Sequence, residues 1–200
     1  RPGMSILRAL LRGAVLAAAI LPVEAAHAQS YPTRPIRLVV PFPPGGSADI
    51  LGRALGQKLG EALGQSVVVE NRPGAGTAIA AELVAKAAPD GYTLMLGTVS
   101  SHAINPALNP KLPFDPLRDF TPVAPVAAIP FALLVHPSVP ARTVPELIGY
   151  ARSKPGKLDY SSAGNGTSNH LAGELFEAMT GTHMVHIPYR GSAPALQDLI

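Results

Sequence analysis

The segment 39–49 reads V-V-P-F-P-P-G-G-S-A-D and joins an apolar run to the start of a helix. Ser47 and Asp49 are residue types that favour a helix N-terminus. The helix is predicted from a 3.6-residue apolar period, formed by Ile50, Leu51, Ala54, Leu55, Leu59 and Leu63. A turn containing Gly45 and Gly46 at this point directs free backbone N–H groups and the helix dipole towards an anion. The segment therefore predicts an anion-binding turn, with a simple tight turn as the alternative.

The residues on either side of this turn predict a parallel sheet. Short β-branched runs indicate strands at 36–40, 66–70 and 92–97. A second helix, after the second strand, has one apolar face formed by Ile79, Leu83, Val84 and Ala87. The β-α-β-α-β order requires a parallel sheet with ligand loops at the carboxyl ends of its strands, so the first lobe is α/β. The proline-rich segment 98–119 is expected to be a long loop, because pairs such as Asn105-Pro106 resist both helix and strand.

A second lobe is predicted to repeat this architecture. Apolar runs at 123–129 and 131–136 are expected to be strands that lead into it. A capping box, Thr143-Val144-Pro145-Glu146, starts a helix that ends near Ser153. Strands are then expected at 158–161 and 184–187, each followed by a helix, the first with an apolar face of Leu171, Leu175, Phe176 and Met179. The predicted organisation is a leader at residues 1–28, lobe one at residues 29–124 and lobe two at residues 125–200.

The N-terminal segment has the pattern of a secretory signal peptide. Arg8 and Arg12 precede an apolar run from Gly13 to Leu21, which ends in the cleavage pattern Ala26-His27-Ala28. The run is shorter than the roughly 20 residues that a membrane-spanning helix needs. Three residues stand before Met4 and the chain stops inside a helical pattern, so we expect a fragment at both ends.

The net charge and the cysteine content limit which binding partners and which chemistry are expected. Residues 1–28 hold three of the 16 Lys and Arg and one of the 13 Asp and Glu, so the formal charge falls from +3 to +1 without them. A nearly neutral chain gives no reason to expect nucleic acid or membrane lipid as a partner. The chain has no Cys, which excludes disulfides and a Cys nucleophile.

A second glycine-rich turn, S-S-A-G-N-G-T-S at 161–168, again joins a strand to a helix start. Gly164 and Gly166 allow a ligand to approach the backbone, while Ser161, Thr167 and Ser168 offer hydroxyl groups. Two such turns from two lobes predict a cleft between them, with helix capping alone as the alternative. His102 and Asn105, in the loop after the third strand, lie where a ligand in that cleft would pass, beside Ser100 and Ser101, with polar packing of the loop as the alternative.

The motifs of common enzymes and metal sites are missing. The sequence has no G-x-S-x-G elbow, no H-E-x-x-H and no phosphate loop ending in G-K-[ST]. Two pairs, His170 with Glu174 and His183 with His186, have metal-ligand spacing but no third ligand nearby. We therefore predict no catalytic residue, no metal and no cofactor. Asp49 is expected to cap the helix, with contact to a ligand ammonium group as the alternative.

Motifs along residues 31–200 resemble those of the Bug-type solute receptors of tripartite tricarboxylate transport systems. They include Y-P-T-R-P-I, V-P-F-P-P-G-G-S-A-D, V-V-E-N-R-P-G-A-G, P-D-G-Y-T-L, H-A-I-N-P, L-P-F-D-P-L-R-D-F-T-P-V, G-N-G-T-S-N-H-L-A-G-E-L-F and I-P-Y-R-G, in that order. The resemblance implies a periplasmic binding protein whose two α/β lobes close on a ligand like a flytrap (type II). Members of the family are longer, so a C-terminal segment that finishes lobe two and returns to lobe one is expected. Many members have Thr where this chain has Ala48.

The resemblance also implies which residues hold the ligand. In the family, loops matching 42–49 and 161–168 hold carboxylates through main-chain N–H groups and bridging waters. The predicted ligand-binding residues are Phe42, Gly45, Gly46, Ser47, Asp49, Ser101, His102, Ser161, Gly164, Gly166, Thr167 and Ser168. The implied function is capture of a small carboxylate by a periplasmic, monomeric receptor that presents it to a membrane permease. A periplasmic ligand sensor and a secreted α/β hydrolase are the alternatives.

Overall fold

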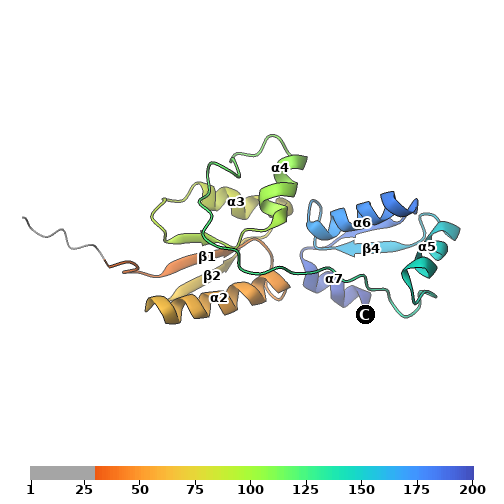
Figure 1. Ribbon diagram of the computed structural model, residues 1–200, viewed down its shortest axis with the longest axis horizontal. Coiled ribbons are helices and arrows are strands. Elements are labelled where there is room, and N and C mark those ends of the chain that lie inside the picture. The colour runs from red at the N-terminus through yellow and green to blue at the C-terminus, as the bar shows by residue number, and fades with distance from the viewer. Residues whose placement is uncertain (1–29) are drawn as a thin grey trace, which may run out of the picture. The chain divides into compact units, whose positions relative to one another are not determined.

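The computed structural model describes residues 30–200, and the predicted signal peptide lies outside the described residues. Contacts divide the chain into a unit of residues 1–31 and a unit of residues 32–200. Every helix and strand described below belongs to the second unit (Figure 1). Within residues 30–200, no helix has both the length and the apolar character that a membrane crossing needs.

Three parallel strands form the first sheet, in the order β2-β1-β3. The central strand is β1 (Ile36–Val40), which pairs with β2 (Val67–Asn71) and with β3 (Thr93–Met95). Its apolar residues are no more than 2% exposed, as expected for a central parallel strand covered on both faces. The predicted parallel sheet and the α/β class of this lobe are confirmed.

The helix α2 (Ser47–Leu63) packs on β1 and β2, and glycines rather than the predicted leucines are its most buried residues on this side. Its buried residues include Gly52 and Gly56, and Ile50 is 65% exposed. A Cβ placed on Gly52 would lie 2.7 Å from Val40 Cγ2, so the helix approaches the sheet too closely for a side chain there. The predicted apolar face was therefore right only in part, because the glycines are buried, the leucines at 51, 55 and 59 are half-buried, and the residues at 50, 54 and 63 are exposed.

The helix α3 (Ala78–Ala85) packs on β1 and β3, and Figure 1 shows it on the opposite side of the sheet from α2. Its fully buried residues are Ala80 and Ala81, whereas Ile79 is 49% exposed. The predicted face of α3 was also right only in part, since Leu83, Val84 and Ala87 are half-buried while small residues make the closest packing on the sheet.

The segment after β3 is helical where a loop was expected. A π-helical turn, η2 (Ser100–Ile104), continues into α4 (Asn105–Leu108). Pro106 lies in the first turn of α4, where a helix needs no N–H donor from that residue. The Asn-Pro pair therefore does not prevent a helix, and the loop begins only after Leu108.

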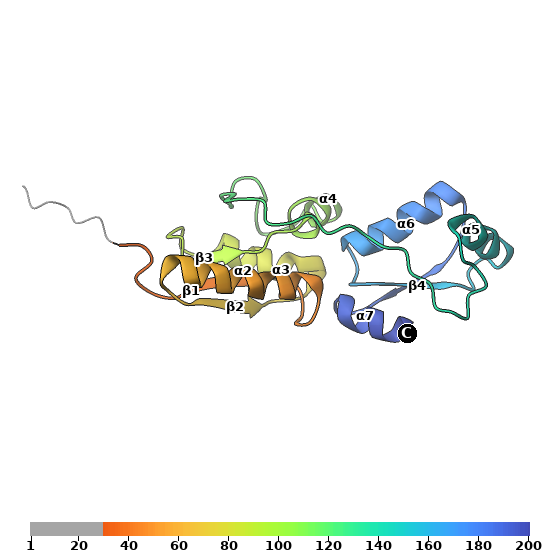
Figure 2. The ribbon, with the colours of Figure 1, turned by 60° about the horizontal axis from the view of Figure 1, so that its bottom comes forward.

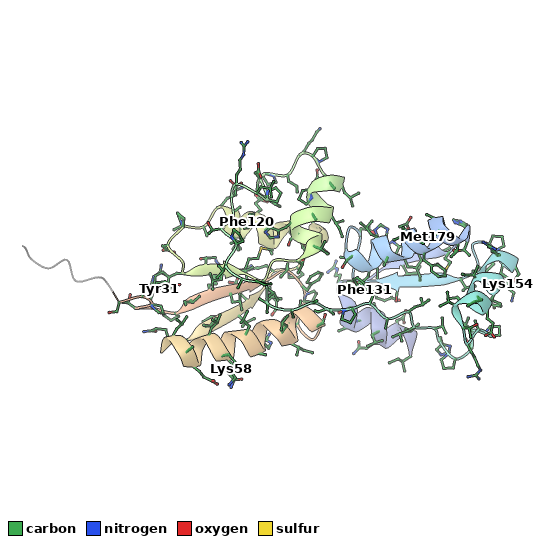
Figure 3. All side chains as sticks on the ribbon, viewed as in Figure 1. Tyr31, Lys58, Phe120, Phe131, Lys154 and Met179 are labelled. Carbon is green, nitrogen blue, oxygen red and sulfur yellow. The ribbon has the colours of Figure 1, made fainter. Side chains whose placement is uncertain are left out.

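No strand forms at 123–129 or 131–136, so both predictions were wrong. The segment pairs with no described strand, and a strand without a partner leaves its backbone N–H and C=O groups unpaired. Its apolar side chains remain exposed, as Figure 3 shows for Phe131, which is 60% exposed.

The second sheet contains two parallel strands, β4 (Asp159–Ser162) and β5 (Val185–Pro188). Before β4, the helix α5 (Val144–Ser153) begins at the predicted cap, where Thr143 Oγ1 accepts from the Glu146 N–H. Between the strands runs α6 (Ser168–Thr180), and α7 (Ser192–Leu199) follows β5. Figures 1 and 2 both show α6 and α7 on opposite sides of β4. The predicted apolar face of α6 is incompletely covered, since none of its residues is buried and Met179 is 78% exposed.

Candidate functional site

Loops that follow the strands of the first sheet contact loops that follow the strands of the second. The Ser168 N–H donates to Ser100 Oγ at 3.2 Å. A Cβ on Gly46 would lie 2.8 Å from Ser192 Oγ, and a Cβ on Gly76 would lie 2.9 Å from the Asn165 carbonyl oxygen. Parallel strands place their carboxyl-end loops at one edge of a sheet, and here two such edges meet. We call residues 42–49 the first loop and residues 161–168 the second loop.

Asp49 organises the first loop from a position that is only 4% exposed. Its carboxylate accepts from the Gly45 N–H and from Asn71 Nδ2, both at 2.9 Å, and pairs with Arg53 at 3.0 Å. Asn71 also donates to the carbonyl of half-buried Phe42 at 2.9 Å. The hydrogen bond from Arg53 is the main cause that lowers the pKa of Asp49 to about 2; burial opposes it, and the bonds from Gly45 and Asn71 add to it. The carboxylate is therefore ionised and already supplied with donors from the protein.

Backbone donors at the start of α2 have no such partner. Gly46 is the N-cap of the helix, and its carbonyl accepts from the N–H groups of Asp49 and Ile50. Among residues 30–200, no acceptor is bonded to the N–H of Gly46, Ser47 or Ala48. Free N–H groups at the positive end of a 17-residue helix are suited to an anion.

The glycine N–H groups of the second loop donate to side chains of the loop and of the helix that follows it. The Gly164 N–H donates to Ser162 Oγ at 3.0 Å, and the Gly166 N–H donates to His170 Nδ1 at 3.3 Å. Thr167 is the N-cap of α6, but its hydroxyl donates to the Gly164 carbonyl at 2.6 Å instead of capping the helix. Ser161 lies exposed at the end of β4. The glycine N–H groups of this loop therefore already have acceptors.

The predicted residues after β3 divide into two kinds. Ser101 is fully buried, and its hydroxyl donates to the Thr98 carbonyl at 3.0 Å and lies 2.8 Å from His102 Nδ1. Burial lowers the pKa of His102, whose ring packs edge-on against Phe120 at 4.6 Å. Within the described part of the chain, neither residue is hydrogen-bonded to the second loop, whereas Ser100 is.

Four residues that shape the loops were not among the predicted ligand-binding residues: Asn71, Ser100, Asn105 and Ser162. Asn105 Nδ2 donates to the carbonyls of Ala75 and Gly76 at 2.7 and 2.9 Å. Asn71 and Ser162 each end a parallel strand, which is the sequence signal that could have found them. Ser100 carries no comparable signal, because its placement depends on the π-helical turn.

Thr77 is strained and unsatisfied. It has a φ of 85°, in the left-handed region that a β-branched residue rarely adopts, and it is 2% exposed. Within the described part of the chain, its Oγ1 is the one buried side-chain polar atom without a hydrogen-bond partner. It lies directly after Gly76, which approaches the second loop, so the strain is stored next to the meeting point of the two sheets.

The arginine beside the first loop is already paired. Arg72 forms an ion pair with Glu70, as does Arg37, and these partners lower the pKa of Glu70, with the Arg37 hydrogen bond as the largest cause. Within residues 30–200, no group of three or more His, Cys, Asp and Glu is placed to hold a metal.

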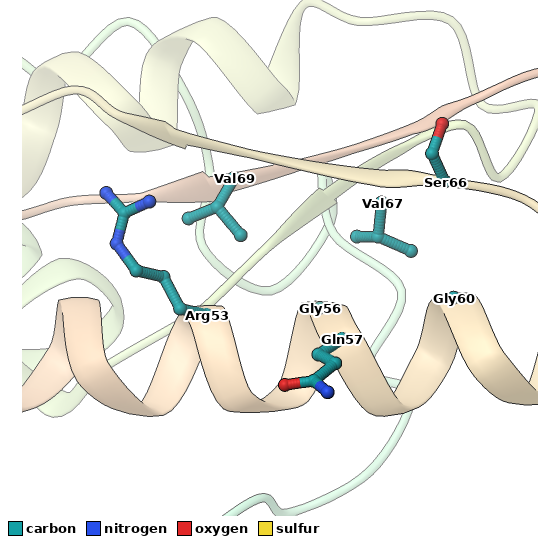
Figure 4. Close-up of a pocket in the computed structure, with 7 residues that line it drawn as sticks. All are labelled: Arg53, Gly56, Gln57, Gly60, Ser66, Val67 and Val69. Carbon is teal, nitrogen blue, oxygen red and sulfur yellow. The ribbon is translucent and has the colours of Figure 1, made fainter.

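A shallow groove lies beside α2 at the edge strand β2, away from the loops (Figure 4). Its volume is about 420 Å³, and it is lined by Arg53, Gly56, Gln57, Gly60, Ser66, Val67 and Val69. The glycines that bring α2 close to the sheet also open this groove, so it follows from the helix packing.

Comparison with known proteins identifies the family. The family described as "Tripartite tricarboxylate transporter family receptor" matches residues 51–200, and the chain belongs to it. The protein BugT of Bordetella pertussis is 41% identical over 174 residues, which cover 86% of this chain and 53% of BugT. The predicted family is thus confirmed.

Solved structures of similar proteins share the fold. Rpa4515 of R. palustris, solved with adipate, is 46% identical with a TM-score of 0.82, and the match covers 84% of this chain and 56% of that one. MatC from Rhodopseudomonas palustris, solved with bound malate, is 37% identical with a TM-score of 0.79 over 84% and 57%. The chain spans between 53% and 58% of the length of the curated relatives that it matches over most of its own length.

Proposed function

We propose that this chain captures a small carboxylate in the periplasm between the first and second loops. The observation that carries the proposal is the row of free N–H groups at Gly46, Ser47 and Ala48, which begins a long helix next to the second sheet. Two relatives with the same fold were solved with dicarboxylates, adipate and malate. A receptor role agrees with the family to which the chain belongs.

The chemistry of the first loop favours recognition of charge by the backbone. Arg72 is engaged by Glu70, and Asp49 is surrounded by its own donors, so neither side chain is free for a ligand. Main-chain N–H groups hold a carboxylate at a helix start without a lysine or arginine. Ligand that binds one loop and is then covered by the other stabilises the closed form by its higher affinity for that form.

The proposed ligand-contacting residues lie in both loops. Gly46 and Ser47 act through their N–H groups, and Ser168 and Ser161 supply polar groups from the second loop. The glycines at 45, 164 and 166 give the loops their shape, because their N–H groups have acceptors in the protein. The closed, monomeric form would then be recognised by a membrane permease.

A proline scan at the helix start tests the proposal. Gly46 has an extended conformation (φ −87°, ψ 172°), which is compatible with a following proline, and Ser47 is the first helical residue, where proline is favoured. Ser47→Pro removes one free N–H and the hydroxyl, whereas Ser47→Ala removes the hydroxyl alone.

The measurement is calorimetric titration of the full-length protein and both variants with adipate, malate and the uncharged diamide of adipate. We expect one of the dicarboxylates to bind, the diamide not to bind, and Ser47→Pro to weaken binding by about 10-fold more than Ser47→Ala. Equal affinity in the two variants, or no binding of either dicarboxylate or of a wider carboxylate panel, would contradict the proposal.

Two other functions are distinguished by simple experiments. If the protein is a ligand sensor, its deletion abolishes a transcriptional response but leaves carboxylate uptake intact. If it is a hydrolase, it cleaves activated esters, and replacing Ser161 or Ser168 abolishes the cleavage.

A further inference from the structure

The turn between β5 and α7 lies against the first loop. We call residues 189–193, which read Y-R-G-S-A, the third loop; α7 begins at its fourth residue. Three glycine positions bring the two loops together: a Cβ would lie 3.0 Å from Pro43 Cδ at Gly191, 2.8 Å from Ser192 Oγ at Gly46 and 3.8 Å from Ala193 Cβ at Gly45. The first loop therefore meets the second lobe at the third loop, where the helices α2 and α7 both begin.

The second loop contacts other parts of the first lobe. The Ser168 N–H donates to Ser100, which follows β3, and the Asn165 carbonyl oxygen lies close to Gly76, which follows β2. Among residues 30–200, no hydrogen bond joins the second loop to the first loop. The part of the second lobe that faces the free N–H groups of the first loop is thus the third loop.

Backbone bonds fix the position of the third loop. The Tyr189 N–H donates to the Ser162 carbonyl at 3.0 Å, and the Gly191 N–H donates to the Ala163 carbonyl at 3.1 Å. Gly191 has a φ of 109°, a conformation that glycine adopts without strain. The second loop and this glycine together set where the next residue, Ser192, is held.

The Ser192 side chain is exposed and has a free hydroxyl group. Within residues 30–200, no hydrogen bond engages its Oγ, and the first turn of α7 contains no acidic residue. Its neighbour across the contact is Gly46, whose own N–H is free, as are those of Ser47 and Ala48. A carboxylate has lone pairs for about four hydrogen bonds, so one group can accept from the first loop and from Ser192 together. The positive ends of two helices also favour a negative charge at this point.

We propose that Ser192 is a further ligand-contacting residue, whose hydroxyl donates to the same carboxylate that the free N–H groups of Gly46 and Ser47 bind. The inference rests on the proposed function and adds a third element to it. The third loop covers the carboxylate that the first loop holds. Ser161 and Ser168 of the second loop are then available for the other end of a dicarboxylate.

Alanine variants of two serines test the contact in the full-length protein. Ser192→Ala removes the proposed donor. Ser66→Ala is the matched control, because Ser66 is also exposed and its hydroxyl also has no partner among residues 30–200, but it lines the groove beside α2, away from the loops. Neither substitution removes a hydrogen bond within the protein, so thermal unfolding without ligand should be unchanged in both variants.

The first readout is calorimetric titration with adipate and with malate. A hydrogen bond to a charged group is lost in Ser192→Ala, so we expect it to bind the preferred dicarboxylate about 10-fold more weakly than the parent. We expect Ser66→Ala to bind it within about 2-fold of the parent, because its hydroxyl is remote from the ligand.

The second readout needs no ligand and uses the absence of Cys from residues 1–200. In the pair Gly45→Cys with Ala193→Cys, the Cβ atoms would lie 3.8 Å apart, which a disulfide requires. The control pair is Gly64→Cys with Ala193→Cys, because Gly64 has a positive φ as Gly45 does but lies at the other end of α2, where a Cβ meets nothing within 4 Å. We expect mild oxidation to form the 45–193 link and not the 64–193 link, as mapped by mass spectrometry of peptides.

The outcomes separate the two proposals. If the parent binds no carboxylate, the proposed function fails, and the role of Ser192 fails with it whether or not the 45–193 link forms. If the parent binds a dicarboxylate and Ser192→Ala binds it equally well, the role of Ser192 alone is overturned. The same holds if the 45–193 link forms no more readily than the 64–193 link, or if Ser192→Ala loses affinity only together with thermal stability.

Discussion

The two loops use the same architecture but are held by different chemistry. Each joins a parallel strand to a helix, and in each a glycine N–H donates to a side chain in the first turn of that helix: Gly45 to Asp49, and Gly166 to His170. In the first loop the acceptor is the ionised carboxylate of Asp49, and in the second loop the acceptors are His170 Nδ1 and Ser162 Oγ. The first loop is therefore held by a charge, whereas the second loop is held by a ring nitrogen and a hydroxyl oxygen, which accept hydrogen bonds without a charge.

The difference also concerns which donors remain for a ligand. Among the backbone N–H groups of the first loop, the Asp49 carboxylate accepts only that of Gly45, so the next three N–H groups stay free. In the second loop both glycine N–H groups are used, and the Ser168 N–H donates to Ser100. The first loop is therefore the stronger anion site, and the second loop contributes shape and closure.

Removing the charge that holds the first loop should have the largest effect. Asp49→Ala leaves the Gly45 N–H, Asn71 and Arg53 without their shared acceptor, and we expect it to lower the free energy of unfolding by about 3 kcal/mol. Urea unfolding measures this. Glu61→Ala is the control, because Glu61 is an exposed carboxylate on the same helix that pairs with Lys58, and it should cost less than about 0.5 kcal/mol. A loss for Asp49→Ala as small as that of the control would show that the first loop does not depend on this charge.

The next largest effect is expected in the pH dependence of stability, to which the first loop contributes through Asp49. The folded-state pKa of Asp49 is lowered to about 2, so its contribution is fully present above its unfolded pKa of about 4 and is lost as pH falls towards 2. We expect about 2 kcal/mol of stability to disappear in this window, by comparison of the parent with Asp49→Asn in acid unfolding. A parent and variant with parallel curves between about pH 5 and about pH 2 would contradict the expectation.

A substitution at Gly76 should disturb the contact between the segment after β2 and the second loop. Gly76 and Gly64 have similar positive φ values, 59° and 67°, but a Cβ meets the Asn165 carbonyl oxygen at 2.9 Å only at Gly76, and nothing within 4 Å at Gly64. Gly64→Ala should cost about 1 kcal/mol from backbone strain, and Gly76→Ala about 1.5 kcal/mol more because of the contact. Thermal unfolding of both variants measures the excess. Equal losses of stability in the two variants would mean that the second loop can shift away from Gly76 at no measurable cost.

The smallest expected change is a gain at Thr77. Thr77→Gly relieves the positive φ and removes an unpaired buried hydroxyl, and we expect stability to rise by about 1 kcal/mol after the entropy cost of glycine. Thr77→Ala removes the hydroxyl but keeps the strain, so it separates the two causes. If Thr77→Gly is less stable than the parent and binds adipate more weakly, the hydroxyl has a partner in solution that favours this strained conformation.

Sequence patterns located most of the elements and failed in specific places. The β-branched run at 36–40 predicted its strand correctly, because burial on both faces selects such residues. The same hydrophobic logic misplaced the contact face of α2, since Gly52 and Gly56 have no apolar side chain for a periodicity to detect. At 123–136 the residues have strand character, but a strand also needs a neighbouring strand, and none of those described pairs with it.

The ligand loops show the same division. Their positions, glycines and helix starts follow from local residue types, and so does the family resemblance. The sequence alone therefore determined the parallel α/β units, the two glycine-rich turns and the expectation of an anion site. Only the tertiary structure decided which N–H groups stay free, because hydrogen-bond partners come from residues that are distant in sequence, such as Asn71 for Asp49, His186 for Ser162 and Ser100 for Ser168. Whether a hydrogen bond forms depends on differences of a few tenths of an ångström in the distance between donor and acceptor, and the order of residues along the chain does not record such distances.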